Sequence, residues 1–537
     1  MMREKILTKT SYDFTVSAIQ GAMAIARGEL TPMNPNEEPR QHIYLRNNIF
    51  YSIAIDASNI FEDAGGDEAS RVCASKDINA INFLNRIDAK GVSHLLTTVV
   101  DFAGKRIVAQ TPVPGLFSET PADEEELAEE GAESEAAPSK LQTTVVYGKS
   151  DDANGSYLSA DPDFVKKFRK IGQAFHIKEH NVWNEDGSNV VKVVTSMDTK
   201  GMKGTDERDY IIELYRTTPL DIEFIEKNFD LSKEDSYPHK EASIRNEAVE
   251  EWYRRQATVL LKAETDKLEK EKAEKKAKGE KIDEEERPTI TIDDSEITLN
   301  PDCFSLPPAP TPELAKELEA DQKKAREVSK LVTGVLIPEF VSELKDHEIF
   351  RPLDGRHLAS MLHSQGINMR YLGALASQVL DVKAEYLAEL EAKKSEISKE
   401  NVKYDEMRAK QREEAIARVK ATREAAEKGE PLPDYTEEDK KLEEEMNELH
   451  KSTNLSLVPV VQNLECLYDV AVQEMIARAT KHFIRYHISH LPLEVAPYVI
   501  SHVHNALLGS HANKFPTEHQ LDPFLKEAYG HLDLLDR

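Results

Sequence analysis

Within the first 240 residues, short runs of apolar, β-branched and aromatic residues bounded by turn residues recur between helical segments, and such runs are typical of β-strands. Runs over 95–101 and 105–111 flank Ala103 and Gly104, and this spacing predicts a hairpin. The other elements predicted here are strands over 42–56 and 143–147 and helices over 6–27 and 163–175.

A second hairpin is predicted to join 190–198 to 210–216 through a turn that contains Gly201 and Gly204. Two hairpins with few helices between them favour an antiparallel sheet. The first part of the chain is therefore predicted to be an α+β domain.

Beyond residue 240 the apolar spacing becomes helical almost everywhere. We expect an α+β domain, a charged helix with a Pro-rich linker, two parts of a mostly α-helical region and, between these parts, a charged low-complexity arm. The expected boundaries are 1–240, with an acidic insert at 118–140, then 241–312, 313–382, 383–450 for the arm, and 451–537.

Charge changes this picture in one respect. Charged residues make up 31% of the chain and the formal net charge is -29. Any contact with nucleic acid must therefore come from a local basic patch, because the protein as a whole repels phosphates.

The three cysteines, Cys73, Cys303 and Cys466, are too far apart for a disulfide framework or a structural zinc site. No apolar run approaches the roughly 18 residues of a membrane-spanning helix, and no signal peptide is visible. These features predict a cytoplasmic protein without a metal or other cofactor.

Candidate chemistry is sparse. The two-glycine segment at 201–206 lacks the Lys-Ser/Thr pair of a phosphate-binding loop, and a hairpin turn explains it better. No nucleophile has a recognisable partner, and no histidine pair has the spacing of metal ligands. We predict that the protein is not an enzyme.

Two basic clusters remain as candidate RNA-binding sites. Helical spacing places the members of the first on one stripe: Arg478, Lys481, His482 and Arg485. The second is a short basic run: Lys166, Lys167, Arg169 and Lys170. Either cluster could hold phosphates, or could be a solvated helix face that pairs with nearby glutamates.

A third motif looks structural. Within 362–373, Gly366 is suited to end one helix, Asn368 to cap the next, and Gly373 to allow close backbone approach. Local propensity requires no arginine here. We therefore predict that Arg370 is a specific partner of a buried carboxylate or carbonyl group.

This motif and an N-terminal series, 21–24, 33–37 and 46–52, resemble the clustered mitochondria (Clu) family, which is also named after its association with initiation factor three. The resemblance to the Clu domain extends over about 8–224. A resemblance to the family's central helical region covers 336–376 and resumes at 477–482.

The resemblance implies a cytoplasmic scaffold that binds messenger RNAs for mitochondrial proteins, associates with ribosomes and initiation factor three, and maintains the distribution of mitochondria. Contact with the mitochondrial surface is expected to be indirect. The family's N-terminal ubiquitin-like region and C-terminal tetratricopeptide repeats have no counterpart in this sequence, which suggests a truncated or split gene product. The alternative is a protein-interaction module of an initiation factor three complex that does not touch RNA.

Overall fold

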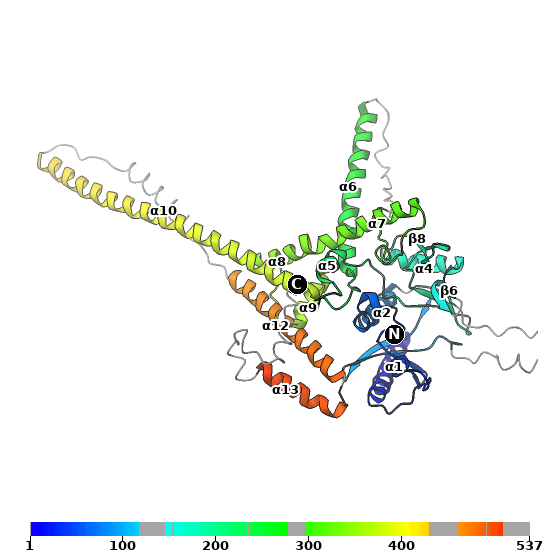
Figure 1. Cartoon of the computed structure of the whole chain (residues 1–537). Helices are drawn as coiled ribbons and strands as arrows, with labels where there is room; N and C mark the ends of the chain where they lie inside the picture. The colour runs from blue at the N-terminus through cyan, green and yellow to red at the C-terminus, as the bar shows by residue number, and fades with distance from the viewer. Residues whose placement is uncertain are drawn as a thin grey trace, which may run out of the picture.

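The computed structural model has an α+β region followed by helices, as predicted (Figure 1). The described residues are 2–87, 89–116, 145–152, 155–233, 236–277, 296–428, 460–489 and 491–508. The expected acidic insert at 118–140 lies outside them, as do 429–459 and the chain from 509 onward.

The first sheet is four-stranded and antiparallel, in the order β1-β2-β5-β4. Its strands are β1 (Ile43–Arg46), β2 (Ile49–Ile53), β4 (Thr97–Phe102) and β5 (Lys105–Gln110). The predicted turn at Ala103 and Gly104 is confirmed, and both residues have positive φ. The region 42–56, expected as one strand, is a hairpin, because Asn47 and Asn48 also adopt the left-handed conformation of a two-residue turn.

Helices pack on both faces of this sheet. They are α1 (Met2–Ala26) and α2 (Asp67–Ile87), the second of which the sequence did not predict. Ile107 of β5 is buried against Ala22 of α1. Its neighbour Arg106 points to the opposite face, where Nη1 donates to the backbone oxygen of Arg71 in α2 over 2.9 Å. The alternation of side chains along β5 thus sends apolar residues to one helix and a charge to the other.

The second sheet is five-stranded, in the order β3-β11-β10-β6-β7, and only the β3–β11 pair is parallel. Its strands are β3 (Ser93–His94), β6 (Val145–Asp152), β7 (Gly155–Ala160), β10 (Lys200–Lys203) and β11 (Asp209–Ile212). Helix α4 (Pro162–Ala174) covers it with Phe164 and Phe168, whose rings lie fully buried beside Tyr147.

The predicted pairing of 190–198 with 210–216 is wrong. Strand β9 (Val190–Val193) instead pairs with β8 (His180–Trp183), because the short loop between them offers a nearer partner. The second hairpin is formed by β10 and β11, so Gly201 lies within a strand and only Gly204 belongs to the turn.

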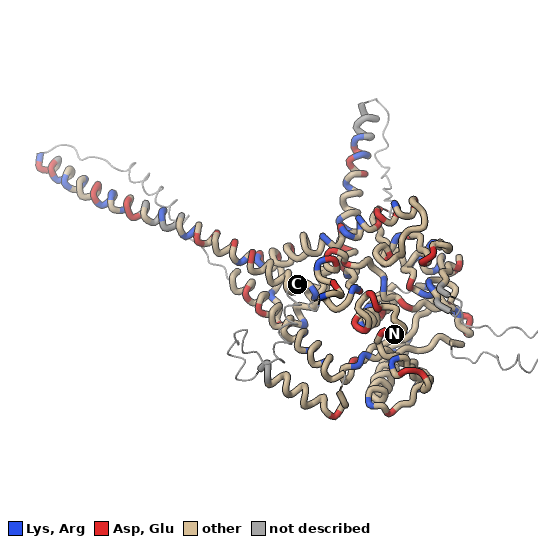
Figure 2. Tube along the Cα trace, in the orientation of Figure 1, with Lys and Arg blue, Asp and Glu red and all other residues tan. Residues whose placement is uncertain are grey.

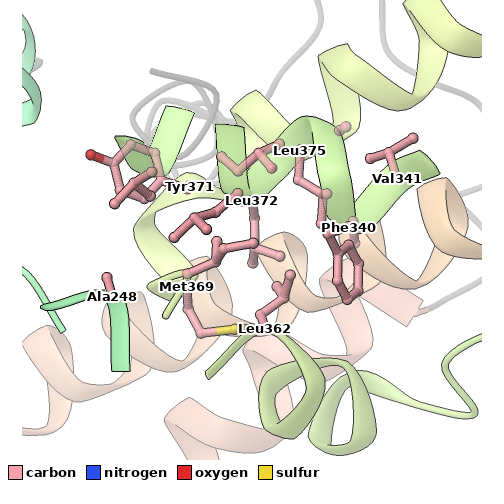
Figure 3. Packing of buried hydrophobic residues seen from close by; sticks show 14 of the residues in the cluster. Ala248, Phe340, Val341, Leu362, Met369, Tyr371, Leu372 and Leu375 are labelled. Atoms are coloured by element: carbon pink, nitrogen blue, oxygen red, sulfur yellow. The ribbon is translucent and has the colours of Figure 1, made fainter. Parts of the chain in front are cut away.

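The remaining α-helices and a π segment follow, and all of them except the last contribute to one large apolar core. They are α5 (Ile222–Asn228), α6 (Asn246–Ala277), α7 (Pro312–Leu331), the π segment η4 (Val332–Leu336), α8 (Ile337–Lys345), α9 (Gly355–Ser364), α10 (Leu372–Lys428), α12 (Val460–Ser489) and α13 (Ala496–Leu508). Figure 3 shows Met369 against Leu362, with Leu372, Leu375 and Phe340 beside them.

Two helices extend away from this core, α6 and the long α10 (Figure 1). Charges of both signs alternate along them (Figure 2), as the sequence predicts for solvated helices. The domain boundary expected after residue 382 falls inside α10, which runs without a break from the core into the arm.

Part of the expected linker, Asp302 and Cys303, is buried. No helix in the described ranges combines the length and hydropathy needed to cross a bilayer.

Candidate nucleic-acid interface

The segment between α9 and α10 is shaped by the residues that its sequence singles out. Gly366 has a φ of 77° and ends α9, with the backbone N–H of Ile367 bonding back to the Leu362 carbonyl. Asn368 caps the 3₁₀ turn η5 (Met369–Tyr371), its side chain accepting from the Arg370 N–H over 3.1 Å. Gly373 is buried in the first turn of α10.

The carboxylate partner of Arg370 is Asp221. One guanidinium nitrogen, Nη2, lies 2.6 Å from Asp221 Oδ2 and 2.7 Å from the backbone oxygen of Ser243. The Tyr371 hydroxyl donates to the same carboxylate over 2.8 Å. Burial opposes the charged guanidinium, but the nearby carboxylate outweighs it and leaves the pKa of Arg370 above its ordinary value. Arg370 is therefore a structural cation between two regions of the chain.

The predicted basic stripe lies on α12, in the part that approaches the first sheet. Arg478 pairs with Glu474 one turn earlier, at 2.8 Å, and Arg485 reaches Glu68 of α2 at 2.5 Å. His482 is half-buried. Lys481 is exposed and forms no ion pair or hydrogen bond with the described residues. The stripe thus faces α2, and Lys481 is its lysine without an ion-pair partner among the described residues.

Sequence reasoning missed the residues that meet this stripe. Arg71 of α2 and Arg106 of β5 lie beside it, joined by Asp101 of β4. Asp101 and Arg106 are directly opposite each other in the β4–β5 ladder. Opposite charges at matching distances from the predicted Ala103–Gly104 turn were the signal that could have revealed this pair. Nothing in the sequence places Arg71 beside them.

The second basic run lies on α4. Lys167 pairs with Asp163 at 2.6 Å and with Asp209. Arg169 pairs with Glu179 at 3.3 Å. Lys166 and Lys170 are exposed and make no ion pair with the described residues. The two predicted clusters are thus on different elements, and each keeps exposed cations.

A cleft of about 980 Å³ opens between α2 and the helical region. Arg370 and Arg478 contribute to its wall, together with His239 and His363. Burial lowers the pKa of His239 to about 3, and Lys76 and Arg370 lower it further. Burial also lowers the pKa of His363 to about 4. Both imidazoles are neutral at physiological pH, in a wall where neighbouring cations oppose protonation.

One buried cluster superficially resembles a catalytic triad. Asp302 accepts hydrogen bonds from the Ser196 hydroxyl at 2.8 Å and pairs with the imidazole of His180 at 2.9 Å. The carboxylate lies between the other two, so the imidazole cannot take the hydroxyl proton. All three side chains are buried, and this cluster fastens the chain around Asp302 to the β8–β9 ribbon. In the part of the chain that is described, no set of three or more potential ligands could hold a metal ion.

Two family models match this chain. Residues 1–224 match the family model described as Clustered mitochondria. Residues 349–531 match the model described as Translation initiation factor eIF3 subunit 135. No solved structure matches.

Among curated proteins, the chain is similar to a Clustered mitochondria protein homolog of Debaryomyces hansenii, with 42% identity over 99% of this chain and 37% of that protein. The homolog of Candida albicans is 39% identical, over 99% of this chain and 38% of its own length. The homolog of Aspergillus fumigatus strain CBS 144.89 is 31% identical, over 98% and 34%. The chain thus spans between a third and two fifths of these relatives.

Proposed function

The chain belongs to the clustered mitochondria family, and from this premise we propose that it acts within a cytoplasmic messenger-RNA-binding scaffold that maintains the distribution of mitochondria. The observation that carries the proposal is the pair of family matches, to Clustered mitochondria and to an initiation factor subunit, in this order on one chain. The second match supports a link to translation initiation.

RNA binding is the finer part of the proposal. It is supported by the exposed cations Lys166, Lys170 and Lys481, which have no carboxylate partner among the described residues. In a protein with a net charge of -29, such cations are where phosphates can be held. The scaffold's role requires no catalysis, and we assign none.

A salt titration tests RNA binding. Fluorescence anisotropy of a labelled single-stranded RNA should give a log affinity that falls linearly with log salt. Changing Arg478, Lys481 and Arg485 together to Gln should lower this slope by roughly 2, at ~0.7 per phosphate contact. The matched control, Arg254, Lys262 and Lys267 to Gln on α6, removes the same charge from a surface far along the chain. An equal loss of slope in both triple variants would mean that the stripe contributes only through the net charge of the protein, and not as a binding site.

The cellular role needs a separate readout. Cells that lack the encoded protein should show clustered mitochondria, and re-expression of the protein should restore an even distribution. Normal distribution in the depleted cells would refute the proposal.

A second candidate function is a protein-interaction module without RNA contact. The observation that favours it is that Arg478 and Arg485 are already paired with glutamates. Co-purification of initiation factor three components that survives nuclease treatment, together with no RNA binding by the purified chain, would select this alternative.

A further inference from the structure

Four cations converge where α12 meets the first sheet. Arg71 comes from α2, Arg106 from β5, and Lys481 and Arg485 from α12. Close contact brings these elements together: a Cβ on Gly104, at the hairpin tip, would lie 2.9 Å from the backbone nitrogen of Ser489. We refer to these four cations as the junction cluster.

The carboxylates around the junction cluster do not balance it. Arg106 takes both oxygens of Asp101, at 2.8 and 2.6 Å. Arg71 is left with a longer contact to the same carboxylate, 3.6 Å, and its Nε is buried without a partner. Arg485 pairs with Glu68, and Lys481 has no acceptor in the described chain. Four positive side chains thus share two carboxylates.

The electrostatic consequence is a positive potential. Burial lowers the pKa of Arg71, and the charges of Arg485 and Arg106 lower it further. The pKa of Lys481 is likewise lowered, first by partial desolvation of its ammonium group, although the side chain as a whole is exposed, and then by the charges of Arg478, Arg485 and Arg106. Cations that oppose each other's protonation gain free energy from a shared anion.

We propose that the junction cluster is a binding site for a phosphate group, built jointly by the Clu domain and the helical region. A phosphate fits better than another carboxylate, because its oxygens point in several directions and can accept from three elements at once. The identity of the biological ligand rests on the function proposed above, in which the group is a phosphodiester of bound RNA. Ser75, which accepts from Arg106 at 2.7 Å, and Arg478 also line the cleft, so the site adjoins that cavity.

Inorganic phosphate is the probe that isolates the site. Isothermal titration calorimetry of the full chain should detect phosphate binding. Lys481→Gln should lower the affinity for phosphate roughly tenfold, which is the effect of losing one charge-assisted hydrogen bond. Lys481→Arg should largely restore it. Lys316→Gln, at an exposed position of α7, is the matched control and should change nothing.

A substitution of Asp101 should change the phosphate affinity in the opposite direction. The side chain of Asp101 is 56% exposed, so Asp101→Asn places no new group in the core, and it removes the carboxylate that competes with phosphate. Phosphate should therefore bind more tightly to Asp101→Asn than to the wild type. Circular dichroism melts verify that each variant is folded.

The outcomes separate this site from the proposed function. Phosphate binding with this pattern of variants, but no RNA binding by the wild type, supports the site and refutes the RNA role. RNA binding that neither Lys481→Gln nor Asp101→Asn alters, with phosphate binding equally unaffected, refutes the site and leaves the RNA role standing. Equal phosphate binding by all variants and the control means an adventitious ion only, and also overturns the site.

Discussion

Arg370 and Asp221 lie 149 positions apart in the sequence, yet a guanidinium nitrogen and a carboxylate oxygen of this pair are 2.6 Å apart. Their side chains are only 6% and 0% exposed. Asp221 precedes α5 at the end of the region matched to the Clu domain, and Arg370 follows α9. The pair therefore joins the two matched regions through a contact from which water is excluded.

Removing this cation should be costly. Arg370→Ala leaves a buried carboxylate without its charge partner, and we expect the free energy of unfolding to fall by about 3–5 kcal/mol. Urea denaturation followed by circular dichroism measures the loss. Arg254→Ala, which breaks an exposed pair with Glu251 on α6, should cost at most about 1 kcal/mol. Equal stability of the two variants would contradict a structural role for Arg370.

Gly366 should not tolerate a side chain. Its φ of 77° is unfavourable for alanine, and a Cβ would lie 2.5 Å from the backbone nitrogen of Ala248. We expect Gly366→Ala to lower the melting temperature clearly more than Gly28→Ala, which changes a glycine with a φ of 74° and open space around it. Gly28→Ala carries only the backbone cost, about 1 kcal/mol. A milder effect at Gly366 would mean that α6 can move away.

Gly366 and Arg370 also show which structural features can be predicted from the sequence. Local chemistry was enough to predict a helix end at Gly366, a cap at Asn368 and a buried partner for Arg370, because each follows from a few neighbouring residues. The identity of that partner, Asp221, depends on tertiary packing and has no local signal. The same limit explains the misassigned partner of β9.

The basic stripe on α12 was predictable as a stripe, because helical spacing alone aligns Arg478, Lys481 and Arg485. Which way it faces was not. Its orientation depends on α2, which the sequence did not predict, and on the β4–β5 hairpin. The ion-pair partner Glu68 and the neighbouring cation Arg71 therefore became visible only in the structure.

Stability should depend on pH through His239. The unfolded chain takes up this proton near the ordinary pKa of 6.5, whereas the folded chain takes it up only near 3. Folding is therefore favoured fully above pH 6.5 and progressively less as the pH falls towards 3, by up to about 1.4 kcal/mol per pH unit. His239→Gln removes this dependence.

Chemical denaturation at pH 8 and pH 5 measures the effect. The stability difference between wild type and His239→Gln should shift in favour of the variant by about 2 kcal/mol at the lower pH. Asp77, whose pKa burial raises to about 6, acts in the opposite direction, since its folded form holds a proton more tightly than the unfolded chain. Comparing variant with wild type cancels that contribution. Parallel pH profiles would show that His239 has the same pKa in the folded and the unfolded chain, and would contradict the prediction.

One helix supplies a matched test of burial. Leu375 in α10 is 0% exposed, whereas Leu387, three turns later, is 42% exposed. Leu375→Ala should lower the free energy of unfolding by about 2–5 kcal/mol, and Leu387→Ala by well under that amount. Thermal melts of both variants provide the comparison. Similar losses would indicate that the arm is covered along its length.

The length of α10 determines the distance between the apolar core and the far end of the arm. A helix of 57 residues measures about 85 Å at 1.5 Å per residue, longer than a typical domain is wide. Its first turns pack in the core, so its far end lies tens of ångströms away from that core (Figure 1). A partner gripped there would stand clear of anything bound at the junction cluster. Two large partners, one at each end of α10, would thus be held by a single chain without steric overlap.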